Sequence, residues 1–80
     1  MRIDKFMWAV RIFKTRSLAS KACTSDKVLL NSELIKPSKN IKVNDIISVK
    51  VIPIWKTYKV ENLPTSRLGP KLVGNYINER

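Results

Sequence analysis

The chain has no histidine, one cysteine, two glycines and only six acidic residues among its 80. Without histidine no His-based catalytic triad can form, and a single cysteine cannot complete a structural zinc site. Cys23 also has no partner for a disulfide, so we expect a buried thiol in a reducing compartment. Gly69 and Gly74 cannot supply a phosphate-binding glycine loop. The sequence therefore predicts a protein that is not an enzyme and has neither a metal site nor a cofactor.

Long hydrophobic runs are also missing. Residues 1–5 lack the apolar stretch of a signal peptide, and no run approaches the ~20 residues of a membrane span. Eighty residues make one domain, too short for a catalytic domain of ordinary size, yet 44% hydrophobic residues are enough for a core. These features predict a small folded protein of the cytoplasm, without membrane contact, which we expect to be a monomer.

Positive charge is what the sequence has in excess. Sixteen Lys and Arg residues give a net charge of +10. Residues 1–42 carry ten basic and three acidic side chains, whereas residues 43–80 carry six and three. Such an excess on a foldable chain is typical of a protein with a polyanionic partner, nucleic acid before anionic membrane. A basic surface that serves only solubility is the alternative.

The front half predicts two helices. Over residues 3–13, apolar side chains recur at offsets of three, four and seven, which marks one face of a helix with Asp4 in its first turn. A shorter helix should begin at Thr15 or Ser17, either of which can cap it, and end near Thr24. Its apolar side is expected to consist of Leu18, Ala19, Ala22 and Cys23.

After Lys27 the pattern changes to that of strands. The expected strands cover residues 28–30, 33–35, 46–51 and 55–60, with a short one at 71–73. Asn31 and Ser32 have the chemistry of a two-residue hairpin turn, and Pro53 should end the third strand. The last few residues are expected to fray. The predicted fold class is α+β, with two N-terminal helices packed on a small, mainly antiparallel sheet.

Several short motifs follow one another in a recognisable order. They are Arg2-Ile3-Asp4-Lys5-Phe6, Lys14-Thr15-Arg16-Ser17-Leu18-Ala19, Lys27-Val28-Leu29-Leu30-Asn31, Lys36-Pro37-Ser38 and Val43-Asn44-Asp45-Ile46-Ile47. Together they resemble the S4-type RNA-binding domain over residues 2–51. Asp26, Ser32 and Asn44 stand where that pattern has glycine. Residues 4–11 and 13–17, with a tail like residues 58–73, resemble the heat-shock protein 15 branch of the family.

The resemblance implies an alpha-L, S4-like fold whose RNA contacts gather on the first two helices and the adjoining hairpin. It implies an S4-type domain at residues 1–52, and a C-terminal strand and irregular extension at residues 53–80 that packs on the same domain. In the heat-shock protein 15 branch the ligand is a free large ribosomal subunit that still carries peptidyl-tRNA. We therefore expect structured RNA, ribosomal RNA of the large subunit, as the partner.

The expected RNA-binding residues combine cations with hydrogen-bonding side chains of the front half. They are Arg2, Arg11, Lys14, Thr15, Arg16, Ser17, Lys21, Lys27, Asn31, Lys36 and Lys39. Arginine is suited to bidentate phosphate bonding, and Thr15 and Ser17 stand where the free amides of a helix N-terminus can hold a phosphate. RNA duplexes are read mainly through phosphates and 2′-hydroxyls, which such residues contact.

Two other functions remain open from the sequence. The chain has the motifs of a module that targets a larger RNA-modifying enzyme to its substrate. It also has the composition of a basic protein-interaction or membrane-surface module that would use Trp8, Ile12 and Trp55. DNA binding is disfavoured, because neither expected helix carries an obvious base-reading set of Arg, Asn and Gln.

Overall fold

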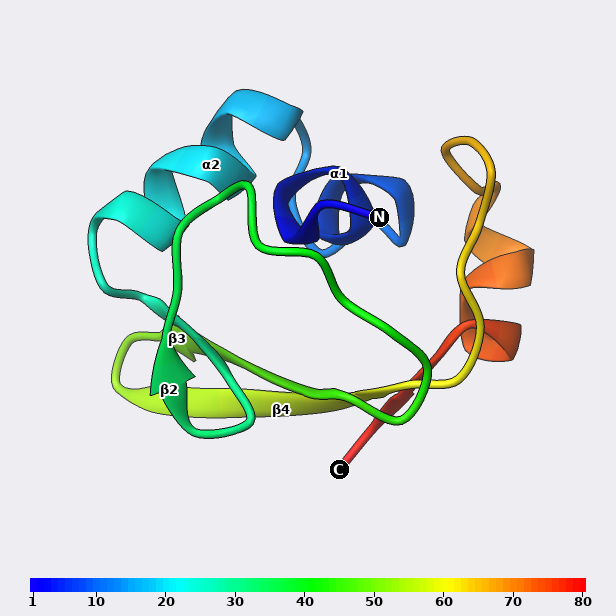
Figure 1. Cartoon of the computed structure of the whole chain (residues 1–80). Coiled ribbons are helices and arrows are strands. Elements are labelled where there is room, and N and C mark those ends of the chain that lie inside the picture. The colour runs from blue at the N-terminus through cyan, green and yellow to red at the C-terminus, as the bar shows by residue number, and fades with distance from the viewer.

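Two helices lie on one side of an antiparallel sheet (Figure 1), in a computed structural model that describes all residues, 1–80. The elements are α1 (Ile3–Ala9), α2 (Arg16–Thr24), β1 (Val28–Leu30), β2 (Glu33–Leu34), β3 (Ile46–Val51), β4 (Ile54–Val60), a 3-10 helix η1 (Pro70–Asn75) and β5 (Ile77–Glu79). The five strands follow the order β2-β1-β3-β4-β5, and every neighbouring pair is antiparallel. The predicted α+β class, with two N-terminal helices on an antiparallel sheet, is confirmed.

The first helix is shorter than its apolar pattern predicts, since α1 ends at Ala9 rather than near Phe13. Arg11 has a φ of 64°, in the left-handed region that ends a helix. Its amide donates to the carbonyl of Trp8, and the amide of Ile12 donates to that of Met7. These two bonds form a Schellman motif with arginine where glycine is usual.

The second helix matches its prediction. Its N-cap is Thr15, whose Oγ1 accepts a hydrogen bond from the amide of Leu18 at 3.1 Å. A second Schellman motif ends the helix, with Asp26 in the left-handed conformation at a φ of 58°. The prediction is wrong for Leu18, whose side chain is 48% exposed because it borders an open groove beside Phe13 instead of entering the core.

The β1–β2 hairpin has the predicted two-residue turn. Asn31 and Ser32 have φ values of 50° and 71°, the signs that a type I′ turn needs at both central positions. Asn44 is also left-handed, at a φ of 78°. Asp, Ser and Asn thus adopt left-handed backbone at all three positions where the S4-type pattern has glycine, and the strands on either side still pair.

Two predictions for the end of the chain are wrong. Residues 71–73 lie in the 3-10 helix η1, which begins at Pro70, a residue that tolerates this position because the first amides of a helix have no partner there. The last residues do not fray: Ile77–Glu79 pair with β4, and the amide of Arg80 donates to the carbonyl of Thr57 at 2.8 Å. The C-terminus is thereby built into the sheet.

The core fills the space between the helices and the inner face of the sheet. Phe6 and Met7 of α1 are completely buried, as is Ile47 of β3. Ala19, Ala22 and Cys23 are the buried residues of α2, and their small size lets that helix approach α1 closely. Burial raises the pKa of the Cys23 thiol to about 11, and the negative charge of Asp4 contributes to the increase.

The burial of Cys23 predicts slow reaction with thiol reagents at pH 8. Because the raised pKa leaves little thiolate and the sulfur is enclosed, the native rate should be at least about tenfold below the rate in denaturant. An Ellman reaction followed with and without urea measures both rates. Similar rates would mean that the buried face of α2 is wrongly assigned.

Candidate nucleic-acid interface

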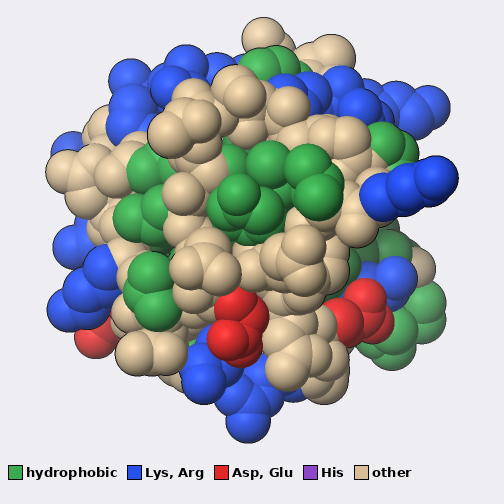
Figure 2. All heavy atoms as spheres, turned by 90° about the vertical axis from the view of Figure 1, so that its right-hand side faces the viewer, with side chains coloured by type: hydrophobic (Ala, Val, Ile, Leu, Met, Phe, Trp, Pro, Cys, Tyr) green, Lys and Arg blue, Asp and Glu red, His purple; other side chains and the backbone are tan.

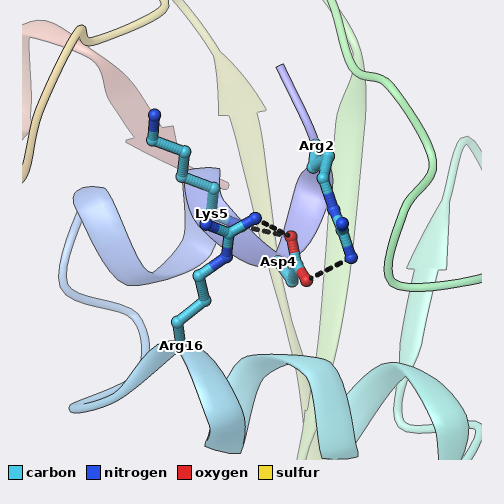
Figure 3. Close-up of polar contacts among 4 residues, drawn as sticks. All are labelled: Arg2, Asp4, Lys5 and Arg16. Carbon is cyan, nitrogen blue, oxygen red and sulfur yellow. Dashed lines mark hydrogen bonds and ion pairs between the residues drawn. The ribbon is translucent and has the colours of Figure 1, made fainter.

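Asp4 is buried between two arginines that both reach the surface (Figure 3). Its Oδ2 accepts from an Arg2 Nη2 at 3.0 Å, and its Oδ1 lies 3.5 Å from an Arg16 Nη2. The backbone amide of Lys5 donates to the same Oδ1 at 2.7 Å. No other ion pair occurs in the chain. One carboxylate therefore joins the residue before α1 to the first residue of α2.

The two arginines keep much of their surface in water. Their side chains are 49% and 44% exposed, against 4% for Asp4. A guanidinium has five N–H donors, so one bond to the carboxylate leaves the others for a ligand. The arrangement fixes Arg2 and Arg16 as a pair with unused donors at the surface, which suits phosphate groups.

The segment 36–40 runs beside this pair. The amide of Ile3 donates to the carbonyl of Lys39 at 2.8 Å, and Arg2 forms an isolated β-bridge with Asn40. Lys36 and Lys39 are exposed and border an open hollow next to the β1–β2 hairpin. The fold thus brings together four of the expected residues, Arg2, Arg16, Lys36 and Lys39, around the N-terminus of α1.

A second group of expected residues lies along α2. Lys21 and Lys27 line a groove of about 370 Å³ whose apolar wall includes Phe13 and Leu18. Lys50 of β3 lines the same groove, and its amide donates to the carbonyl of Lys27 at 2.8 Å. Sequence reasoning missed Lys50, because only the pairing of β1 with β3 places it here. We call Lys21, Lys27 and Lys50 the lysine groove.

Other expected residues have roles inside the protein. The Nε of Arg11 donates to the carbonyl of Leu68 at 2.7 Å, which joins the end of α1 to the C-terminal segment. Asn31 donates to Asp45 through Nδ2 at 3.2 Å and accepts from the amide of Ile46 through Oδ1 at 2.9 Å. The Oγ1 of Thr15 serves as the cap of α2. Lys14 and Ser17 are exposed near the start of that helix.

The side of the molecule that carries residues 61–76 differs from the two basic regions above in that it exposes hydrophobic side chains. Figure 2 shows hydrophobic side chains gathered in the middle of this face, with Lys and Arg around its margins. Leu63 and Leu72 are exposed there, and Arg67 stacks over Trp8 at 5.5 Å from the ring centroid. In Figure 1, η1 and α2 lie at opposite ends of the molecule. The lysine groove along α2 thus lies away from η1.

The structure contains no group of His, Cys, Asp and Glu side chains that could hold a metal ion. None of its helices has the length and apolar character needed to cross a bilayer. A model of the S4 domain family matches residues 1–47, more than half of the chain.

The chain belongs to the S4 domain family.

Relatives of this S4 protein include two kinds of bacterial protein. An RQC P-site tRNA stabilizing factor from Helicobacter pylori is 38% identical over 71 residues, which are 89% of this chain and 84% of that protein. A heat shock protein 15 homolog from Haemophilus influenzae is 35% identical over 69 residues, 86% of this chain but 53% of that protein. The trimeric structure of heat shock protein 15 from Vibrio cholerae superposes with a TM-score of 0.93 at 32% identity, covering 100% of this chain and 81% of that one.

These comparisons confirm the resemblance that the motifs indicated, including its heat-shock protein 15 branch. The expected division at residue 52, the individual RNA-binding residues and the monomeric state stay predictions. In this S4 protein the Arg-x-Asp motif, Arg2 to Asp4, and the Arg16 of the second motif meet in one ion-pair cluster. The two motifs are therefore parts of a single structural unit.

Asp4→Asn should lower the free energy of unfolding by about 1–2 kcal/mol, because the amide keeps the size of the side chain but loses both ion pairs at a buried position. Urea denaturation measures the change. Glu33→Gln is the matched control: it removes a carboxylate from an exposed residue without an ion pair and should change stability by less than about 0.5 kcal/mol. Equal effects would mean that the cluster does not stabilise the fold.

Proposed function

We propose that the protein binds structured RNA of the large ribosomal subunit and catalyses no reaction. The observation that carries the proposal is the buried Asp4, which holds Arg2 and Arg16 together at the surface with donors unused. Hydrogen bonds from a guanidinium to phosphate are charge-assisted and geometrically specific. A pair of fixed arginines therefore recognises the spacing of phosphates as well as their charge.

The lysine groove extends the proposed interface along α2. Lys21 and Lys27 are exposed, and the groove holds no acidic residue. An RNA backbone whose phosphates contact Arg2 and Arg16 can continue along α2 to the lysine groove. Together the arginine pair and the lysine groove span both helices and the adjoining strand, as expected for RNA that is recognised by shape.

The relatives support the ribosome as the partner. The Helicobacter pylori relative is named for P-site tRNA, and the P site is a tRNA site of the ribosome. We infer that the protein acts in the cytoplasm on large subunits that carry peptidyl-tRNA, as part of their rescue or recycling. One relative is named as a tRNA stabilizing factor, which supports a binding function over catalysis.

Replacing Lys21 and Lys27 by alanine should weaken binding to purified large ribosomal subunits at least about tenfold, or ~1.4 kcal/mol. Each phosphate contact releases counterions from the RNA on binding. A variant that lacks two contacts releases fewer, so its slope of log Kd against log salt should be smaller by about 2. The charge-matched control is Lys71→Glu, which also lowers the net charge by two, at an exposed residue of η1 that lies at the opposite end of the molecule from α2 (Figure 1). Fluorescence anisotropy over a salt series measures both quantities.

The control should leave affinity within about twofold, because charges more than ~10 Å from the interface are screened at ordinary ionic strength. The unchanged protein should also bind large subunits more tightly than small subunits. If Lys71→Glu weakens binding as much as the double lysine variant does, binding depends on net charge alone. If the two subunits bind equally, the assignment to the large subunit is wrong.

A further inference from the structure

The end of the β3–β4 hairpin exposes a run of apolar side chains that the proposed interface does not use. Val51, Ile52, Ile54 and Trp55 are 44%, 79%, 57% and 43% exposed. Tryptophan is a costly residue to leave in water, since its large ring is buried in most proteins. A cluster of this kind at a hairpin end therefore indicates contact with another molecule.

The strand register separates the tryptophan from its aliphatic neighbours. Lys50 of β3 pairs directly with Trp55 of β4, so both side chains lie on one face of the sheet. Lys59 lies on the same face, four residues further along β4. Val51 and Ile54 pair with each other on the opposite face, the one that carries the core residue Ile47.

The face that carries Trp55 is open. Figure 1 shows both helices on the other side of the sheet, with no element covering this one. Thr57 lies beside Trp55 on this face, and its Oγ1 is 3.5 Å from the Oγ of Ser48. We call the side chains of Ser48, Lys50, Trp55, Thr57 and Lys59 the outer platform. The same face also carries Ile46 opposite Lys59, and Leu29 and Leu34 beside Ser48. The part of the face around Trp55, next to the β3–β4 turn, is therefore polar and basic, and its apolar residues lie further from the turn and toward β2.

The β3–β4 hairpin that forms the outer platform carries only positive charge. Residues 46–60 contain three lysines and no acid. Asp45 is buried, where it accepts from Asn31 and from the amide of Lys42. Glu79 lies opposite Tyr58, the neighbour of Lys59, but on the face of the sheet that carries Ile47 and not on that of Trp55. An aromatic ring flanked by cations, without an opposing carboxylate, matches the chemistry of nucleic acid that has unpaired bases.

We propose that the outer platform binds single-stranded RNA, with an unpaired base stacked on Trp55 and neighbouring phosphates bound by Lys50 and Lys59. The inference rests on the proposed RNA-binding function and adds a second class of contact to it. Lys50 also lines the lysine groove, so an RNA strand that leaves α2 can pass round the sheet at Lys50 to reach the platform on the other face. A protein partner is disfavoured because the immediate neighbours of Trp55 on this face are Lys50 and Thr57.

Stacking predicts which replacements of Trp55 preserve binding. In a Trp8→Phe background, Trp55 is the only tryptophan, and oligoadenylate of about ten nucleotides should quench its fluorescence. Trp55→Phe, which keeps an aromatic face, should change the affinity for oligoadenylate less than about twofold, whereas Trp55→Leu, which keeps only hydrophobicity, should lower it at least about fivefold. Anisotropy of labelled oligoadenylate measures the affinities.

Ile52→Ser is the matched control, since it removes the most exposed apolar side chain of the same hairpin end. It should leave oligoadenylate affinity unchanged. If Trp55→Phe and Trp55→Leu bind equally, or if Ile52→Ser weakens binding as much as Trp55→Leu, the surface is an apolar docking site for protein and stacking is refuted. Absence of quenching would also refute it.

A failure of the proposed function would look different. Large subunits would then bind no better than small subunits, while oligoadenylate would still quench Trp55 and still distinguish Phe from Leu. That result would retain the platform and discard the large-subunit assignment. The reverse pattern, a preference for large subunits with no quenching, would discard the platform alone.

Discussion

A buried carboxylate shared by two arginines is the interaction on which the arrangement of the two helices and of the proposed interface depends. Asp4 is 3% exposed, so its charge is tolerable only because Arg2, Arg16 and the amide of Lys5 all bind it. The same contacts hold the start of α2 against α1. Stability and the presentation of cations to a ligand therefore arise from one cluster, and a change at Asp4 affects both.

Left-handed residues determine where the helices and the β1–β2 hairpin end. Arg11 and Asp26 end α1 and α2 with the same hydrogen-bond pattern, and Ser32 completes the hairpin turn. Each adopts a conformation that is easiest for glycine, at a cost of about 1 kcal/mol. Arg11 gains a hydrogen bond to Leu68 in that position, which draws the C-terminal segment against α1. The shape of the chain is thus set at a few short turns.

Local sequence signals predict α2, the β1–β2 hairpin and β3, because each depends on a few adjacent residues. The signal is a cap for α2, a turn pair for the hairpin and a β-branched alternation for β3. The end of α1 was not predictable in this way: the apolar stripe continues to Phe13, and only the φ of Arg11 stops the helix. Likewise β5 exists because Ile77 finds Val60 across the sheet. Strand pairing between residues so far apart in the sequence cannot be predicted from the few residues of either strand.

The same distinction holds for the candidate site. Counting charge identified the front half, and the motifs singled out Arg2 and Arg16, but neither shows that Asp4 joins them. Lys50 was missed because strand pairing alone places it beside Lys27. The side-chain amide of Asn31 can hydrogen-bond a ligand, and in the fold it donates to Asp45 and accepts from the amide of Ile46. Residue type predicts what a side chain can bind, and the fold decides whether it is available.

The most direct test of this account is the sign of the change in RNA affinity caused by Asp4→Asn. Net charge alone predicts tighter binding, since the variant carries one negative charge fewer. The positioning of two arginines by Asp4 predicts weaker binding to large ribosomal subunits, by at least about threefold, at a temperature where circular dichroism shows the variant folded. In a chain that already carries Arg2→Ala and Arg16→Ala, the same substitution should no longer weaken binding. Tighter binding in the otherwise unchanged chain would contradict the account.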